Sequence, residues 1–216
     1  TPILFSPDWP RRLLRLPPVP LSEEVPRVQG SHRTSKQFLA GFLAVYIGWQ
    51  LLFPFRHLLY PGNPSWTEEG QQFAWRMMLR RKEVWIRFYA TEKASGTTVE
   101  FPMNMFLTAR QISAVAVCPD QIVAASHFFA SRLHQKGIAD VEIRAVALVS
   151  LNGRKPQLMI KPELDLTTVH RTWGHQSWII PLTEPLTDTP WDINSDDWPQ
   201  TLGIKLPVSQ SLPGQR

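Results

Sequence analysis

Residues 38–55 read FLAGFLAVYIGWQLLFPF, an apolar run without an ionic side chain. At about 1.5 Å of rise per residue, a helix over residues 38–60 is long enough to cross a hydrocarbon core of about 30 Å. Pro54 is expected to kink the last turn of this helix, close to its exit from lipid. The run therefore predicts one membrane-spanning helix. The alternative interpretation is a buried helix of a soluble protein.

Basic residues flank this helix unequally. Arg27, Arg33 and Lys36 precede it, and only Arg56 lies close after it. The positive-inside rule places the flank with more Lys and Arg in the cytoplasm. We therefore expect an integral membrane protein whose larger C-terminal part is extracytoplasmic, on the periplasmic or lumenal side.

Two glycines and the start of the chain bear on the neighbours of this helix. Gly41 and Gly48 are seven residues apart and share one helical face, which favours close packing against another helix. The chain begins at Thr1 with a short apolar run that ends before Pro7. These features predict a C-terminal fragment in which the helix is the last of a bundle. The expected partners are the lipid bilayer and the missing N-terminal membrane helices of the same protein.

The overall composition narrows the class of partner and of site. The chain has a formal charge of +5, nine Trp, 20 Pro and a single cysteine, Cys118. A basic surface suits anionic lipid. No nucleic acid is expected, because the Lys and Arg residues are scattered and no recognition motif accompanies them. One cysteine excludes an intrachain disulfide and a Cys-based zinc cluster. His127 and His134 stand two helical turns apart, too far for one metal without a ligand between them, so no metal is predicted.

The fold class predicted for the whole chain is α+β, with the transmembrane helix followed by an extracytoplasmic domain that contains β-hairpins. The expected parts are a juxtamembrane Pro- and Arg-rich connector (1–36), the transmembrane helix (37–60), the extracytoplasmic α+β domain (61–190) and an irregular C-terminal tail (191–216).

Local patterns predict the elements of that domain. Ser65-Trp66-Thr67-Glu68 reads as a capping box, from which a helix should run to about Arg81. Alternating apolar and polar residues predict strands, and Asn152-Gly153 is a strong signal for a two-residue hairpin loop. The other expected elements are strands at 83–92, 97–101, 141–149 and 157–160 and helices at 109–116, capped by Thr108, and at 119–137.

Three motifs follow one another where the apolar run ends: FPFRHLLYPGN (53–63), WTEEG (66–70) and FAWRMM (73–78). At these separations they resemble the vitamin K-dependent gamma-glutamyl carboxylase family, including its bacterial relatives, grouped as horizontally transferred transmembrane domain proteins. Asp165-Leu166 and the segment Thr172–Leu182 also resemble the later part of that family. The resemblance covers about residues 7–186.

The resemblance implies a polytopic enzyme with a helical membrane bundle and a β-rich domain on its lumenal or extracytoplasmic face. In the full-length carboxylases, oxidation of reduced vitamin K, or a related quinol, by O2 is coupled to removal of a glutamate γ-proton, and the carbanion captures CO2. The lysine base and the histidine of the oxygenation lie in membrane segments upstream, and neither Lys36 nor Lys82 replaces them. The chain is expected to supply the substrate-side domain and not to be active alone.

Four residues are candidates for substrate binding in a site that takes a glutamate-containing peptide. Trp75 matches a family tryptophan of the glutamate-site region, and Met78 belongs to the same motif. Arg80 stands where the animal enzymes have a histidine, and its guanidinium can pair with a carboxylate through two hydrogen bonds. Gln71 stands where those enzymes have a tyrosine. His57 lies where the helix leaves lipid, and no catalytic residue is assigned.

A second function class remains open at this point. The chain can also be read as a non-enzymatic membrane-anchored binding module, with the hairpins and the Trp-rich C-terminal segment as its partner surface. Upstream sequence discriminates the two: further spanning helices with a buried Lys and His favour the enzyme, and a start codon close to Thr1 favours the anchor.

Overall fold

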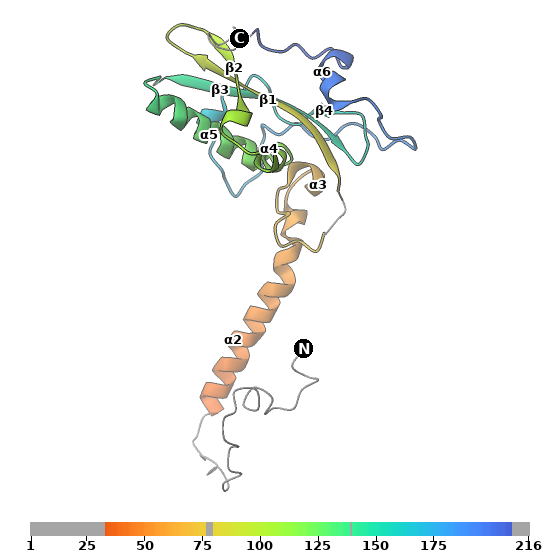
Figure 1. Cartoon of the computed structure of the whole chain (residues 1–216). Coiled ribbons are helices and arrows are strands. Elements are labelled where there is room, and N and C mark those ends of the chain that lie inside the picture. Colours follow the sequence, from red (N-terminus) through yellow and green to blue (C-terminus); the bar gives the residue numbers. More distant parts are fainter. Residues whose placement is uncertain (1–32, 77–79, 139, 209–216) are drawn as a thin grey trace, which may run out of the picture. The chain divides into compact units, whose positions relative to one another are not determined.

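The computed structural model describes residues 33–76, 80–138 and 140–208 (Figure 1). Its contacts divide the chain into two units, Thr1–Ile47 and Gly48–Arg216. The division falls inside the apolar helix and not at either end of it. Most of the predicted juxtamembrane connector, residues 1–32, lies outside the described residues.

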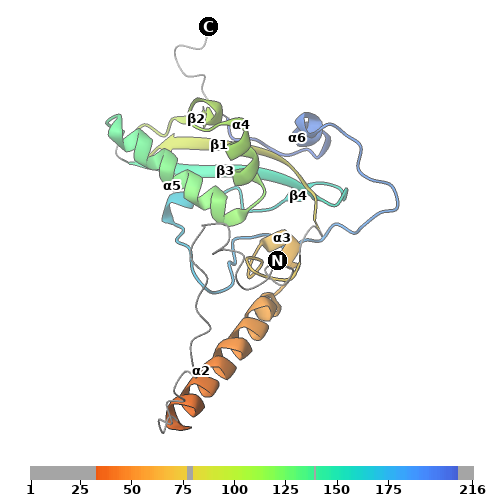
Figure 2. The ribbon, with the colours of Figure 1, turned by 60° about the horizontal axis from the view of Figure 1, so that its bottom comes forward.

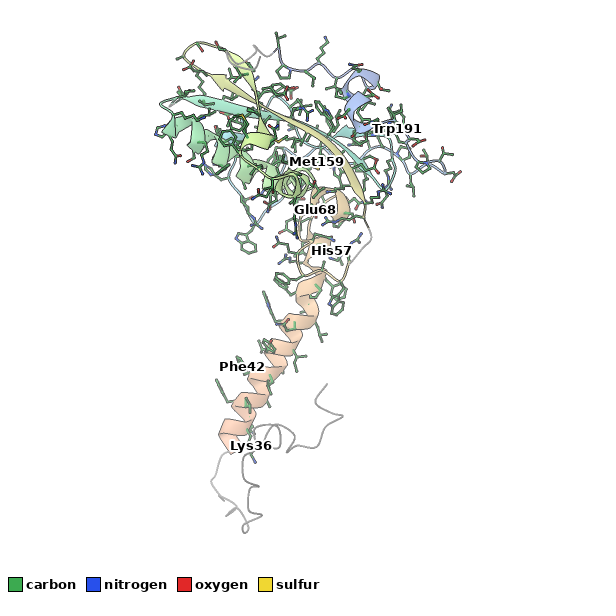
Figure 3. The ribbon with its side chains drawn as sticks, viewed as in Figure 1. Lys36, Phe42, His57, Glu68, Met159 and Trp191 are labelled. Carbon is green, nitrogen blue, oxygen red and sulfur yellow. The ribbon has the colours of Figure 1, made fainter. Side chains whose placement is uncertain are left out.

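The apolar stretch forms helix α2 (Arg33–Leu52) and a 3-10 helix, η2 (Phe53–Leu59). The helical type changes at Pro54, because proline has no N–H to donate and its ring crowds the preceding turn. The stretch from Lys36 to Leu59 is long and apolar enough to cross a membrane. The large apolar side chains along this stretch are exposed, as Phe42 shows in Figure 3.

The segment after η2 differs from the prediction. A helix was expected from residue 65 to about residue 81, but α3 covers only Pro64–Thr67. The side chain of Asn63, not of Ser65, caps it by accepting a hydrogen bond from the backbone N–H of Ser65 at 2.9 Å. Glu68 ends α3 with a φ of 64°, and left-handed backbone recurs at Gly70 and Phe73. A right-handed helix cannot pass through such residues, so the described remainder of this segment is irregular.

A four-stranded antiparallel sheet forms the centre of the domain, in the order β2-β1-β3-β4. This confirms the predicted α+β class. The strands are β1 (Lys82–Glu92), β2 (Thr98–Phe101), β3 (Val141–Leu151) and β4 (Gln157–Leu158). Both predicted hairpins are present, with β1 turning into β2, and β3 turning into β4 at Asn152-Gly153.

Helices cover one face of the sheet. The elements between β2 and β3 are η3 (Met103–Met105), α4 (Ala109–Ala116) and α5 (Pro119–Gln135), and α4 begins with a capping box between Thr108 and Gln111. Figure 2 shows α4 and α5 lying across the sheet. Even-numbered residues of β1 face these helices. Among them, the ring of Phe88 meets that of Phe129 edge-on, with centroids 5.1 Å apart. The short helix η4 (Leu166–Thr168) closes this larger core through fully buried Leu166.

The opposite face is covered by the end of the chain. Residues 191–216 were expected to form an irregular tail, but η5 (Ser195–Asp197) and α6 (Trp198–Thr201) occupy part of this segment. Trp198 is fully buried in a second apolar cluster with Trp85 and Tyr89 of β1 and Val146 and Leu148 of β3. The odd-numbered side chains of β1 thus need the C-terminal segment as their cover. Residues 209–216 lie outside the described residues.

Candidate functional site

Residues 53–81 contain all four predicted site residues, and Arg56 joins the start of this segment to its middle. The Arg56 guanidinium donates from Nη2 to the carbonyl of Gln72 at 2.7 Å and from Nε to the carbonyl of Gly70 at 3.4 Å. It also lies 4.4 Å from the centroid of the Phe53 ring, within the range of a cation–π contact. Arg56 therefore fixes the loop that follows α3 against η2.

His57 is buried next to the same loop (Figure 3). Its Nδ1 lies 2.9 Å from the carbonyl oxygen of Pro54, which can only accept, so Nδ1 carries the proton. Gly70 packs so tightly on this histidine that a Cβ at position 70 would lie 2.7 Å from the Cα of His57. The backbone φ of +66° at Gly70 also suits glycine. The structure thus places His57 as a support of the loop.

Glu68, also labelled in Figure 3, receives two cations. Its carboxylate pairs with the guanidinium of Arg80 and, at 2.7 Å, with the ammonium of Lys82. Lys82 Nζ also donates to the carbonyls of Trp66 and Val117, each at 2.8 Å. We call Glu68, Arg80 and Lys82 the Glu68 cluster. It ties the 53–81 segment to the first residue of β1.

Lys82 is the most perturbed base of the cluster. Burial, and second to it the positive charge of Arg80, lower the pKa of Lys82 from 10.5 to about 7. Its three acceptors match the three N–H groups of the ammonium form, and only 2% of the side chain is exposed. Near neutral pH this lysine therefore exchanges between a fully hydrogen-bonded ammonium and a buried amine.

The lowered pKa of Lys82 predicts how stability changes with pH. Between about pH 7 and 10.5 the unfolded chain keeps the proton that folded Lys82 has released, so the contribution of this group to stability rises with pH. The melting temperature of the full chain in detergent should therefore rise from pH 6.5 to 9.5 relative to that of a Lys82→Met variant. Tyr89, whose pKa is raised from 10.0 to about 12 by burial, acts in the opposite direction between about pH 10 and 12, above the range of this measurement. If the melting temperatures of the unmodified chain and of the Lys82→Met variant change with pH in the same way, the prediction is contradicted and Glu68 keeps Lys82 protonated throughout this range.

A second set of contacts holds the 53–81 segment to the loop before Ile180. The Glu69 carboxylate accepts from the backbone N–H of Gln176 at 2.6 Å and lies 3.0 Å from Nδ1 of His175. The indole N–H of fully buried Trp66 donates to the carbonyl of Ile180 at 2.7 Å. These links join residues more than 100 positions apart and fix the base from which residues 71–76 extend.

Trp75 is the most exposed of the predicted site residues that the structure describes. Its side chain is 66% exposed, and its ring packs edge-on against Phe55 with centroids 5.5 Å apart. Within the described part of the chain, Trp75, Arg80 and His57 make no recorded contact with one another. Each contacts a different part of the 53–81 segment. Met78, the fourth predicted residue, lies outside the described residues.

Glu68 and Lys82 were missed as members of the site. The sequence pattern assigned Glu68 to the first turn of a helix, and nothing local pairs it with a lysine 14 residues later. The left-handed turn at Glu68 and the buried position of Lys82 create this pair. In the sequence, only the charged Lys82 at the start of a predicted strand hinted that this residue has a partner in the site.

A comparison with protein families agrees with these observations. The family model described as vitamin K-dependent gamma-carboxylase, lumenal domain, matches residues 35–185, from α2 to beyond the contacts at Ile180. No solved structure gives a significant match. The family description and the apolar helix are consistent with a membrane protein that has a lumenal domain. Because the match covers well over half of the chain, this protein belongs to the vitamin K-dependent gamma-carboxylase lumenal domain family.

Proposed function

We propose that the chain is the C-terminal, substrate-side part of a gamma-carboxylase-like integral membrane protein. Helix α2 crosses the bilayer, and the domain lies on the extracytoplasmic side. Trp75 and Arg80 contribute to one wall of a site for a peptide glutamate. Family membership supports the class of reaction, and the length and apolar composition of Lys36–Leu59 support the span.

The charge balance of the Glu68 cluster is the observation that carries the proposal. When Lys82 is protonated, two cations share a single carboxylate. Lys82 is enclosed, whereas 34% of the Arg80 side chain is exposed, so the excess positive charge meets solvent through Arg80. A guanidinium has five N–H donors, and its contact with Glu68 is made through Nη1. A substrate carboxylate can pair with the remaining donors, with its aliphatic stem against the exposed Trp75.

The described residues do not fit the oxygenation half of the reaction. In the family, reduced vitamin K or a related quinol supplies, with O2, the base strength that removes the γ-proton before CO2 adds. Here the N–H groups of Lys82 are all engaged, and Nδ1–H of His57 is held by Pro54. We therefore assign to this chain the binding of the glutamate side chain, and assign quinol chemistry to none of the residues that the structure describes.

Kinetics of the full-length gene product test this assignment. Trp75→Ala and Arg80→Gln should each raise the KM for a short glutamate-containing peptide about tenfold, which corresponds to about 1.4 kcal/mol. CO2 incorporation into the peptide and quinol epoxidation are both measured. The KM of Arg80→Lys should lie between those of the unmodified protein and Arg80→Gln. Lysine restores the positive charge but not the paired N–H donors of the guanidinium group.

Matched variants separate binding from folding. Trp173→Ala removes a tryptophan that is 90% exposed, and Arg110→Ala removes an exposed arginine; both should leave the KM within about twofold. Melting temperatures of all variants are compared first, because Arg80 also pairs with Glu68. An unchanged KM in both Trp75→Ala and Arg80→Gln would contradict the proposed substrate site. Peptide binding without any epoxidation would favour the membrane-anchored binding module.

A further inference from the structure

One edge of β1 is only half covered. β3 pairs with β1 along its whole length, from Lys82 to Glu92. On the other side, β2 pairs with β1 only from Phe88 to Thr91. The first residues of β1 therefore have a partner strand on one side, β3, and none on the other. We call this unpaired side the open edge of β1.

The alternation of the ladder shows which backbone groups face that open edge. Asn152 N–H donates to the carbonyl of Arg81, so odd-numbered residues of β1 bond toward β3. Glu92 N–H donates to the carbonyl of Thr97, so even-numbered residues bond toward β2. Lys82, Val84 and Ile86 thus direct their backbone N–H and C=O groups at the open edge.

Little within the described part of the chain uses these groups. The Ile86 carbonyl accepts from Nη1 of Arg87 at 3.1 Å, and no hydrogen bond is recorded for the backbone of Val84 on its outer side. β2 does not continue alongside them, because it ends at Phe101. The chain turns away there into η3. An edge of this kind accepts an additional strand.

Two adjoining cavities run along the open edge. The larger, of about 670 Å³, includes Arg81, Glu83, Val84 and Ser195 in its lining. The smaller, of about 250 Å³, includes Val84, Ile86 and Ser195. Because both share Val84 and Ser195, they form one groove beside the strand, where a continuation of β2 would lie.

We propose that this groove binds an extended peptide segment, which adds to β1 as an antiparallel strand in line with β2. The open backbone groups specify the occupant, because only another extended backbone presents donors and acceptors at their spacing. The site lies along β1 and is distinct from the exposed Trp75, so this inference does not rest on the proposed function.

The groove walls indicate the side chains of that peptide. Met103, Ile112 and Ala116 line the side of the helices and are apolar. The basic residues of the lining, Arg81, Lys82 and Arg87, each pair with a carboxylate. On the side of η5 the lining also includes Asp192 and Asp196, exposed carboxylates for which no ion pair is recorded among the described residues. Side chains of a strand alternate between the two faces. The peptide therefore alternates apolar residues with Lys or Arg.

Binding of a defined peptide to the full chain in detergent micelles tests the proposal. The probe is a fluorescein-labelled heptapeptide in which valine and lysine alternate, and binding is followed by fluorescence anisotropy. Two analogues carry N-methyl groups on alternate backbone nitrogens, one in each register. Only the analogue whose N-methyl groups replace the N–H groups that face β1 should bind more weakly, by about tenfold or more. Equal binding of both analogues would overturn the added strand.

Protein variants test the location. Asp196→Lys should weaken binding about tenfold, whereas Glu163→Lys, the same charge change at another exposed loop, should not. Val84→Pro removes one outward N–H while leaving the bonds to β3, and should also weaken binding. If this variant does not fold, the comparison of the two N-methyl analogues still tests the added strand. Equal affinity in Asp196→Lys and wild type would overturn the site. So would sedimentation that shows the peptide-free chain pairing with a second copy through this edge.

Discussion

Replacing Glu68 by glutamine is expected to lower the free energy of unfolding by about 3–5 kcal/mol, because it leaves a buried charge without its partner. The affected charge is the ammonium of Lys82, whose side chain is 2% exposed. The loss should be largest near pH 6 and smaller near pH 9, where folded Lys82, with a pKa of about 7, is mostly an amine in either protein. Denaturant unfolding of the full chain in detergent, followed by tryptophan fluorescence, measures both values.

Two controls distinguish this effect from a general loss of surface charge. Glu83→Gln breaks an exposed pair with Arg81, in which 82% of the arginine side chain is accessible, and should cost less than about 1 kcal/mol. Adding Lys82→Met to Glu68→Gln should recover much of the stability, because the unpaired charge is removed together with its partner. Equal losses in Glu68→Gln and Glu83→Gln would show that the Glu68 cluster does not stabilise the fold.

Replacing Trp66 by alanine is expected to destabilise the chain by about 3–5 kcal/mol. Trp66 is fully buried in the core formed by the sheet and its helices, and its indole N–H donates to the carbonyl of Ile180 at 2.7 Å. Its own carbonyl accepts from Lys82. The alanine variant therefore opens a cavity at the point where the 53–81 segment meets the domain. The measurement is the midpoint of denaturant unfolding.

Two further tryptophan variants separate the causes of this loss of stability. Trp66→Phe keeps most of the apolar volume but leaves the Ile180 carbonyl without its donor, so a loss of about 1–3 kcal/mol is expected. Trp75→Ala removes a side chain that is 66% exposed and should cost less than about 1 kcal/mol. A Trp66→Ala variant as stable as Trp75→Ala would contradict the anchoring role of Trp66.

The candidate site was only partly predictable from the sequence. The motifs at 53–78 located the segment and named Trp75, and the comparison with the animal enzymes named Arg80. The expected helix through Arg81 is absent over its described part, because left-handed residues at Glu68, Gly70 and Phe73 end α3 after one turn. These conformations depend on contacts with His57, with Arg56 and with Lys82, which no local pattern encodes.

The sequence by itself determined the apolar helix, the long strands and helices α4 and α5, since each rests on local features: an unbroken apolar run, alternation of side chains, a Thr108 cap, a Pro119 start and Asn-Gly at a turn. Only the tertiary structure decided the Glu68 cluster, the burial of Trp198 of the C-terminal segment against the sheet, and the open edge of β1. Each of these joins residues far apart in the chain. The pairing of a buried charge, or the cover of a sheet face, is fixed by which surfaces pack together and not by the local sequence.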